Sequence, residues 1–200
     1  MPFVVWITGL PGAGKTTIAK ILMEILEEKG IPARYIRLDE IRRIIVPNPR
    51  YTEEERDIVY RALVLMAKFL HECGVNVVLD ATGHRRRWRD LARELIPGFL
   101  EVYVKCPIEI CMKRETEREQ SLVKKRLYLD ALERLRKGVK IEGLGEVPGV
   151  DVPYEESFNP DLILESDRLN PRESAMLIYQ KIVESTDCLH VGPGAPQRSR

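Results

Sequence analysis

The stretch GLPGAGKT at residues 9–16 decides the fold. It matches the pattern GxxxxGK(S/T) in full, follows the apolar run FVVWIT (3–8) and precedes the amphipathic run TTIAKILMEILEEKG (16–30). Strand, glycine-rich loop and helix in this order are typical of a phosphate loop, whose backbone N–H groups wrap the phosphates of a nucleoside triphosphate. Lys15 can reach the β- and γ-phosphates, and the Thr16 hydroxyl can take Mg²⁺. The residues predicted to bind the nucleotide here are Gly9, Gly12, Ala13, Gly14, Lys15, Thr16 and Thr17.

Outward from this loop, short apolar runs alternate with helical patterns. The runs predict strands at 3–8, 33–39, 75–80, 99–106 and 161–166, and no hairpin signal joins any two of them. This alternation predicts an α/β fold, a doubly wound parallel sheet of about five strands with helices on both faces. One of the helices is expected to begin at Thr52, with Glu55 completing a capping box. Its predicted apolar face consists of Ile58, Ala62, Leu65, Phe69 and Leu70.

Length and segment composition suggest a single domain over residues 1–185. Residues 107–137 are charged and helical, and residues 138–160 are rich in Gly and Pro, so we expect a small helical lid at about 112–150. The tail 186–200 has the composition of a disordered segment.

The composition excludes several classes of protein. The 200 residues carry 32 Lys and Arg against 31 Asp and Glu, a net charge of +1 that argues against a nucleic-acid partner. Apolar residues make up 44% of the chain, as in a globular protein, and no apolar run approaches the ~18 residues of a membrane span. The four cysteines lack CxxC spacing, and the apolar start has no basic segment before it. We therefore expect reduced thiols and a cytoplasmic location.

Two acids end predicted strands next to the phosphate loop. In an open α/β sheet, ligands bind beyond the carboxyl ends of the strands, so Asp39 and Asp80 should both face the γ-phosphate. We predict that Asp39 is the base that accepts the proton of an attacking hydroxyl and that Asp80 holds magnesium through water. Each acid could instead cap the helix that follows it.

Arginines gather close to the same strand ends. Arg42 follows Asp39, Arg56 lies on the next predicted helix, and Arg86 and Arg89 follow Asp80, so these four are predicted to bind an anionic acceptor. Arg114, near the end of the helix entering the lid, is predicted to close on the transferring phosphoryl group. Lid lysines such as Lys125 are further candidates, and each of these cations could also belong to a solvated face.

No NKxD guanine motif is present, so a small kinase with a lid fits better than a GTPase. The predicted activity is ATP-dependent phosphoryl transfer to the hydroxyl of a small molecule. Two less favoured alternatives are a kinase acting on nucleosides or polynucleotide ends and a non-catalytic ATP-binding switch.

Several segments together resemble adenylylsulfate (APS) kinases over about residues 3–180. These segments are GLPGAGKTT (9–17), YTEEER (51–56), AKFLHECGV (67–75), FLEVYVKCPIEIC (99–111), LY (127–128) and PGVDVPYEESFNPDLILES (148–166). The resemblance implies the P-loop kinase fold, MgATP as donor and the ribose 3′-hydroxyl of adenylylsulfate as acceptor. It also implies ATP contacts at Arg114 and in the loop 167–169, including Arg168, acceptor contacts at Tyr51 and Lys125, and a homodimer.

The departures from the family pattern concentrate in the acceptor region. The family's DGDN-x-R is RLDEIR (37–42) here, which keeps the second acid and loses the first. A family Asn is replaced by Val59, and FISPYR is replaced by ATGHRR (81–86) after an additional acid, Asp80. The family's FTG is VPG (147–149). These exchanges favour, as the alternative acceptor, a smaller alcohol such as free L-serine or L-threonine.

Overall fold

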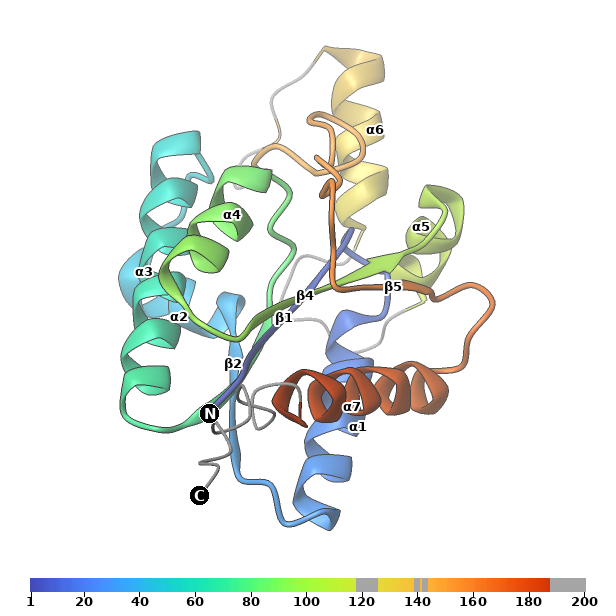
Figure 1. Cartoon of the computed structure of the whole chain (residues 1–200). Helices are drawn as coiled ribbons and strands as arrows, with labels where there is room; N and C mark the ends of the chain where they lie inside the picture. Colours follow the sequence, from blue (N-terminus) through green and yellow to red (C-terminus); the bar gives the residue numbers. More distant parts are fainter. Residues whose placement is uncertain (118–125, 139–140, 142–143, 188–200) are drawn as a thin grey trace, which may run out of the picture.

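The computed structural model describes residues 1–117, 126–138, 141 and 144–187, and Figure 1 shows their arrangement. Five parallel strands form one sheet in the order β2-β3-β1-β4-β5. The strands are β1 (Val4–Thr8), β2 (Ala33–Arg37), β3 (Asn76–Asp80), β4 (Phe99–Lys105) and β5 (Leu162–Glu165). The predicted α/β fold with about five parallel strands is confirmed.

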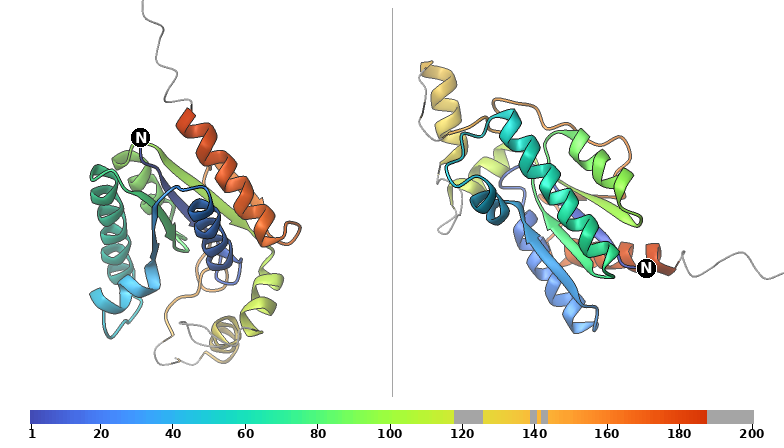
Figure 2. Two further views of the ribbon diagram at one scale, coloured as in Figure 1. Left: turned by 90° about the horizontal axis from the view of Figure 1, so that it is seen from below. Right: turned by 90° about the vertical axis from the view of Figure 1, so that its left-hand side faces the viewer.

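Helices cover both faces of this sheet. They are α1 (Lys15–Glu28), α2 (Leu38–Ile45), α3 (Glu53–Glu72), α4 (Arg86–Leu95), α5 (Ile108–Thr116), α6 (Leu127–Lys137) and α7 (Pro171–Asp187). Helices α1 and α7 lie on one face, and α2, α3 and α4 lie on the other (Figures 1 and 2). Helices α5 and α6 extend beyond the carboxyl end of the sheet (Figure 1). In the described part of the chain, no helix is long and apolar enough to cross a membrane.

Strand β1 separates two hydrophobic cores. Every residue of β1 is buried, and its side chains alternate between the two faces of the sheet. Val5 and Ile7 join the core under α1 and α7, whereas Val4 and Trp6 join the core under α3 and α4. A strand buried on both faces explains why residues 3–8 are apolar without alternation.

The second strand ends earlier than predicted. The sequence suggested a strand over 33–39, but β2 ends at Arg37 and Asp39 lies in the first turn of α2. Acidic residues are favourable at a helix N-terminus, where the backbone N–H groups carry partial positive charge. Asp39 and Glu40 satisfy this preference in α2.

Helix α3 begins as predicted but turns a different face inward. The Thr52 side chain accepts a hydrogen bond from the Glu55 backbone N–H, as expected of its N-cap. The predicted apolar face is wrong, because Ile58 and Phe69 are 58% and 54% exposed. The residues that α3 buries are Arg56, Val59, Tyr60, Leu63, Val64, Ala67 and His71. Apolar residues occur on both sides of this helix, so periodicity alone does not choose between them.

The chain end also differs in part from the prediction. Residues 186 and 187, expected in a disordered tail, are the last two residues of α7. The rest of that tail, 188–200, lies outside the described residues, as do positions 118–125, 139–140 and 142–143 of the predicted lid.

One buried polar side chain next to α4 has no partner. Both ring nitrogens of His84 are buried and lack a hydrogen bond within the described structure, and the ring packs edge-on against Trp88. Burial lowers the pKa of His84 from 6.5 to about 3, and the nearby Arg56 guanidinium acts in the same direction. His84 is therefore neutral in the folded protein near neutral pH.

This histidine predicts an acid-dependent loss of stability. Because its folded pKa lies below its unfolded pKa, the His84 contribution to stability is complete above pH 6.5 and is lost progressively as the pH falls towards 3. Between pH 7.5 and pH 5.5 the loss should be about 1.4 kcal/mol. His84→Leu should remove this part of the pH dependence in urea unfolding, whereas His71→Gln should retain it. Equal pH dependence in wild type and His84→Leu would contradict the assignment.

Candidate active site

The main cavity opens at the carboxyl end of the sheet, between β1 and β3. Its volume is about 610 Å³, and it is lined by the phosphate loop, α2, the start of α3 and residues 144–148. The chain leaves β1 into α1 on one face and leaves β3 towards α4 on the other. The cavity therefore lies where the winding of the sheet reverses, which is the usual ligand position in open α/β sheets.

The phosphate loop closes the floor of this cavity. Gly9 has φ +143°, and a Cβ there would lie 2.4 Å from the Val104 carbonyl oxygen, so no side chain fits. The Lys15 ammonium group donates hydrogen bonds to the Gly9 and Leu10 carbonyl oxygens, each at 2.9 Å. The loop residues Gly12, Gly14, Lys15, Thr16 and Thr17 line the cavity, as predicted for a nucleotide site. The other two predicted loop residues, Gly9 and Ala13, do not line the cavity, and Ala13 is fully buried.

Asp80 meets the start of α1 across the gap between β1 and β3. Thr16 donates a hydrogen bond to Asp80 Oδ2 at 2.7 Å, and the Tyr35 hydroxyl donates to the same oxygen at 2.9 Å. The Arg37 Nε lies 3.8 Å from it. Burial and the neighbouring Asp80 carboxylate raise the pKa of Tyr35, so this hydroxyl remains a donor. Thr16 and Asp80, each predicted to serve the magnesium ion, are thus in direct contact.

The Thr16 and Asp80 side chains fit a magnesium ion whose remaining ligands are phosphate oxygens of the nucleotide and water. Within the described ranges, no group of three or more His, Cys, Asp or Glu side chains could hold a metal by itself. Mg²⁺ in kinases commonly uses one or two protein oxygens, with phosphate oxygens and water completing the shell. The hydroxyl of Thr16 beside the carboxylate of Asp80 provides such a pair.

The acceptor side of the cavity is formed around α2. Asp39 and Arg42 both line it, and their side chains are 4.0 Å apart. The Arg42 guanidinium lies 5.2 Å from the centre of the Tyr51 ring, in a cation–π arrangement. Asp39, Arg42 and Tyr51 are thus brought together, as the sequence predicted, opposite the phosphate loop.

Arg56 lines the same cavity, but much of its guanidinium is committed to the backbone. Its Nε donates to the Tyr51 carbonyl oxygen at 3.1 Å, and its Nη2 donates to the Glu146 carbonyl oxygen. Burial lowers the pKa of Arg56 from its usual value. The side chain joins the loop before α3 to the segment 144–148, which gives the cavity a fixed wall.

Arg114, on α5, and Arg168 both lie at the loop that follows β5. Arg114 donates to the Ser166 carbonyl oxygen at 2.7 Å and to its hydroxyl at 3.2 Å. Arg168 pairs with Glu165 at 2.7 Å and borders a second hollow of about 480 Å³. Neither arginine belongs to the lining of the main cavity. The predicted acceptor contact Lys125 lies outside the described residues.

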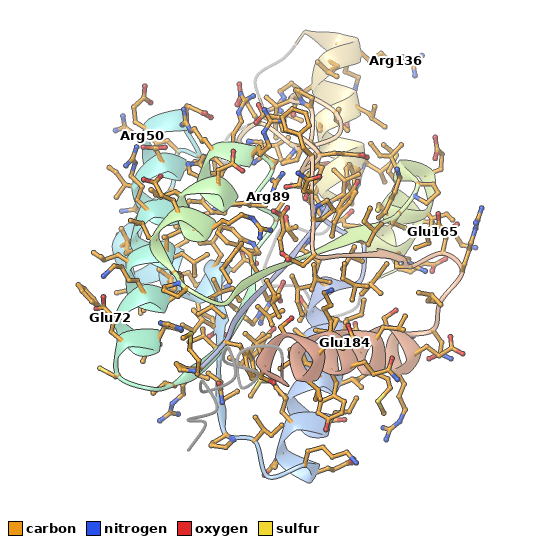
Figure 3. All side chains as sticks on the ribbon, viewed as in Figure 1. Arg50, Glu72, Arg89, Arg136, Glu165 and Glu184 are labelled. Carbon is orange, nitrogen blue, oxygen red and sulfur yellow. The ribbon has the colours of Figure 1, made fainter. Side chains whose placement is uncertain are left out.

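Arg89 does not reach the cavity. Figure 3 shows it between α4 and the sheet, and its side chain is 0% exposed. Its Nε bonds Glu101 at 2.7 Å, and other N–H groups bond the Gly83 and Glu155 carbonyl oxygens. The prediction that Arg89 binds the acceptor is therefore wrong. A run of arginines in the sequence does not distinguish the one that turns inward to meet a buried acid.

Arg86 is not brought to the cavity either. Its guanidinium lies 3.9 Å from the centre of the Phe158 ring and 3.6 Å from Asp90, on the outer side of α4.

Sequence reasoning missed the residues that support Asp80. Tyr35 and Arg37 lie on β2, and Arg37 is the register partner of Asp80 on β3. The signal was available in principle, because adjacent parallel strands that end together bring their last residues into contact.

A phosphate loop with a hydroxyl–carboxylate pair, placed at the winding reversal of a parallel sheet, defines a P-loop protein that binds a nucleoside triphosphate. Comparison with known proteins agrees with this class. The family model for adenylylsulphate kinase matches residues 1–165, and the chain belongs to that family.

Relatives of this chain carry the same family name. A probable adenylyl-sulfate kinase of Archaeoglobus fulgidus is 38% identical over 168 residues, which are 84% of this chain and 98% of that protein. One from Pyrococcus abyssi is 36% identical over 182 residues, covering 91% and 95% of the two chains. Among solved structures, the Mycobacterium tuberculosis APS kinase CysC in complex with AMPPNP and APS superposes with a TM-score of 0.74. It is 30% identical, with 92% of this chain and 98% of that chain covered.

The burial of Arg89 gives a direct test of its role. Arg89→Met should lower the free energy of unfolding by about 3 kcal/mol, because the buried Glu101 would lose its closest cation and keep Arg93, 3.7 Å away, and the Ser157 hydroxyl. Arg86→Met on the outer side of the same helix should cost less than about 1 kcal/mol. Urea unfolding of the two variants measures both values. Unchanged stability of Arg89→Met together with weakened acceptor binding would return Arg89 to the acceptor site.

Proposed function

We propose that this protein transfers the γ-phosphate of MgATP to the ribose 3′-hydroxyl of adenylylsulfate. The observation that carries the proposal is one cavity in which the phosphate loop and Asp80 face Asp39, Arg42 and Tyr51. Membership of the adenylylsulphate kinase family, together with a structural neighbour named for its complex with AMPPNP and APS, supports the choice of donor and acceptor.

On the donor side, the residues act by binding and orienting the triphosphate. Backbone N–H groups of residues 12–17 surround the phosphates, and Lys15 turns from its loop carbonyls to the β- and γ-phosphates. Thr16 and Asp80 would hold Mg²⁺, which neutralises charge on the β- and γ-phosphate oxygens when bound. Arg114 and the loop containing Arg168 would contact the nucleotide from the side of β5.

On the acceptor side, Asp39 takes the proton of the attacking hydroxyl. It lies in the first turn of α2 and lines the cavity opposite the phosphate loop. Arg42 attracts the anionic acceptor, and Tyr51 offers an aromatic face beside it. Arg56 keeps Tyr51 and residue Glu146 in place.

The base assignment is tested by Asp39→Asn. This variant should lose at least about 100-fold in kcat, because Asn cannot accept the proton. Its affinity for ATP should remain close to that of the wild type, since the phosphate loop is untouched. Turnover is measured by coupled ADP release and ATP affinity by calorimetry. Glu40→Gln, which removes the neighbouring exposed acid of α2, should behave as wild type. Near-normal turnover of Asp39→Asn would show that another group is the base.

The identity of the acceptor is tested by the same ADP-release assay with adenylylsulfate, L-serine, L-threonine and a nucleoside. Turnover of adenylylsulfate at micromolar concentration supports the proposal. Turnover of a hydroxy-amino acid instead would show that the exchanges around Val59 and Val147 have changed the acceptor. ATP binding with no turnover stimulated by any of these acceptors would overturn the small-molecule kinase, and adding a polynucleotide 5′-end to the assay would then test the remaining kinase alternative.

The magnesium assignment predicts a specific defect in Asp80→Asn. The Mg²⁺ concentration needed for half-maximal ATP binding should rise by about tenfold or more, because the carboxylate that holds the metal's water is lost. Binding is followed by titrating Mg²⁺ against a fluorescent ATP analogue. Asp90→Asn on the outer side of α4 is the matched control. An unchanged Mg²⁺ requirement would place the metal elsewhere.

The proposal also includes the cellular location and the oligomeric state of the protein. A cytoplasmic location follows from its need for MgATP, and a homodimer is the assembly that the family resemblance implies. Sedimentation velocity would distinguish a dimer from a monomer.

A further inference from the structure

A buried hydroxyl of the lid reaches the phosphate loop. Tyr128 lies in the first turn of α6, and its side chain is 0% exposed. Its hydroxyl donates a hydrogen bond to the Pro11 carbonyl oxygen at 2.8 Å, although the two residues are 117 positions apart. This bond connects α6 with the loop backbone.

Peptide geometry makes this contact informative about phosphate binding. In a trans peptide unit, the carbonyl oxygen of one residue and the N–H of the next point in opposite directions. A donor that holds the Pro11 carbonyl therefore also fixes the direction of the Gly12 N–H. Pro11 and Gly12 both line the main cavity, and no acceptor in the described part of the chain takes the Gly12 N–H.

The loop is confined from the same side by α5. Gly12 has φ +81°, and a Cβ at this position would lie 2.3 Å from the Cys111 carbonyl oxygen. Any side chain at position 12 would therefore collide with the backbone of α5. Glu115 of α5 accepts the Leu127 N–H at 3.1 Å, which joins α5 to the start of α6. The hydrogen bond between Glu115 and Leu127 therefore fixes the start of α6, and with it Tyr128, relative to α5 and the phosphate loop.

The hydroxyl also stays protonated. Burial raises the pKa of Tyr128, and the neighbouring cysteine and glutamate side chains act in the same direction. Tyr128 is therefore a permanent donor to the loop.

We infer that Tyr128 is a positioning residue for nucleotide binding: by holding the Pro11 carbonyl, it aims the Gly12 N–H at the β- and γ-phosphate groups of the nucleotide. Tyr128 itself does not touch the substrate. The inference rests on the nucleotide site of the proposed function and is independent of which alcohol accepts the phosphate. It predicts that the tyrosine favours nucleotides with a β-phosphate over nucleoside monophosphates.

The test is Tyr128→Phe, which keeps the ring in the core and removes only the hydroxyl. Affinities for AMPPNP and AMP are measured by isothermal titration calorimetry at fixed Mg²⁺. We expect the Kd for AMPPNP to rise about fivefold, equivalent to ~1 kcal/mol, and the Kd for AMP to stay within about twofold of its wild-type value. The selective loss is the readout that a purely structural role would not produce.

Tyr103→Phe is the matched control, because it removes another buried tyrosine hydroxyl, which bonds Glu156 in the hollow beside Leu10 and makes no hydrogen bond to the loop backbone. It should leave the ratio of the two affinities unchanged. Urea unfolding of both variants confirms that the titrated protein is folded. Equal losses for AMPPNP and AMP in Tyr128→Phe, or no loss for either, would overturn the inference. Because no acceptor is present, failure of adenylylsulfate turnover leaves this result unaffected.

Discussion

The hydrogen bond from Thr16 to Asp80 is the contact on which the candidate site depends. Thr16 belongs to the first turn of α1, and Asp80 is the last residue of β3. They meet because β1 and β3 are parallel neighbours, with Ile7 opposite Asp80 in register. A register shift by one residue would turn Asp80 to the other face of the sheet. The strand pairing that buries the core therefore also sets the distance between the phosphate loop and its acid.

The pairing of β2 with β3 also brings two positions that depart from the resembled family pattern to the same end of the sheet. Relative to the family pattern, this chain has lost the first acid of the segment 37–42 and has an additional acid at position 80. Arg37 and Asp80 are register partners on β2 and β3, so both positions lie at the same end of the sheet. Both residues line the cavity at that end. The Arg37 Nε lies 3.8 Å from Asp80 Oδ2 and adds a positive charge beside this acid.

The parts of the structure that could be predicted from sequence are those specified by local pattern. The loop 9–16, the parallel strands and the Thr52 cap each follow from residues close together in the chain. The inward face of α3 and the burial of Arg89 follow from tertiary contacts. Helix α3 has apolar residues on both sides, and packing against α2 and α4 determines which side is buried. Arg89 turns inward because Glu101, on β4, leaves a buried charge to be paired.

The cationic character of the site is smaller than the count of arginines implies. Arg89 is hydrogen-bonded to Glu101 and to backbone carbonyls. Arg56 is hydrogen-bonded to the carbonyls of Tyr51 and Glu146. A guanidinium bound to carbonyl oxygens has fewer N–H groups left for an anion, because its five donors lie in one fixed plane. These two arginines shape the walls of the cavity. The attraction for phosphate must come chiefly from the loop N–H groups and from the cations that line the opening, among them Lys15 and Arg42. A near-neutral chain can therefore hold an anion site, since the site is made by the direction of N–H groups more than by net charge.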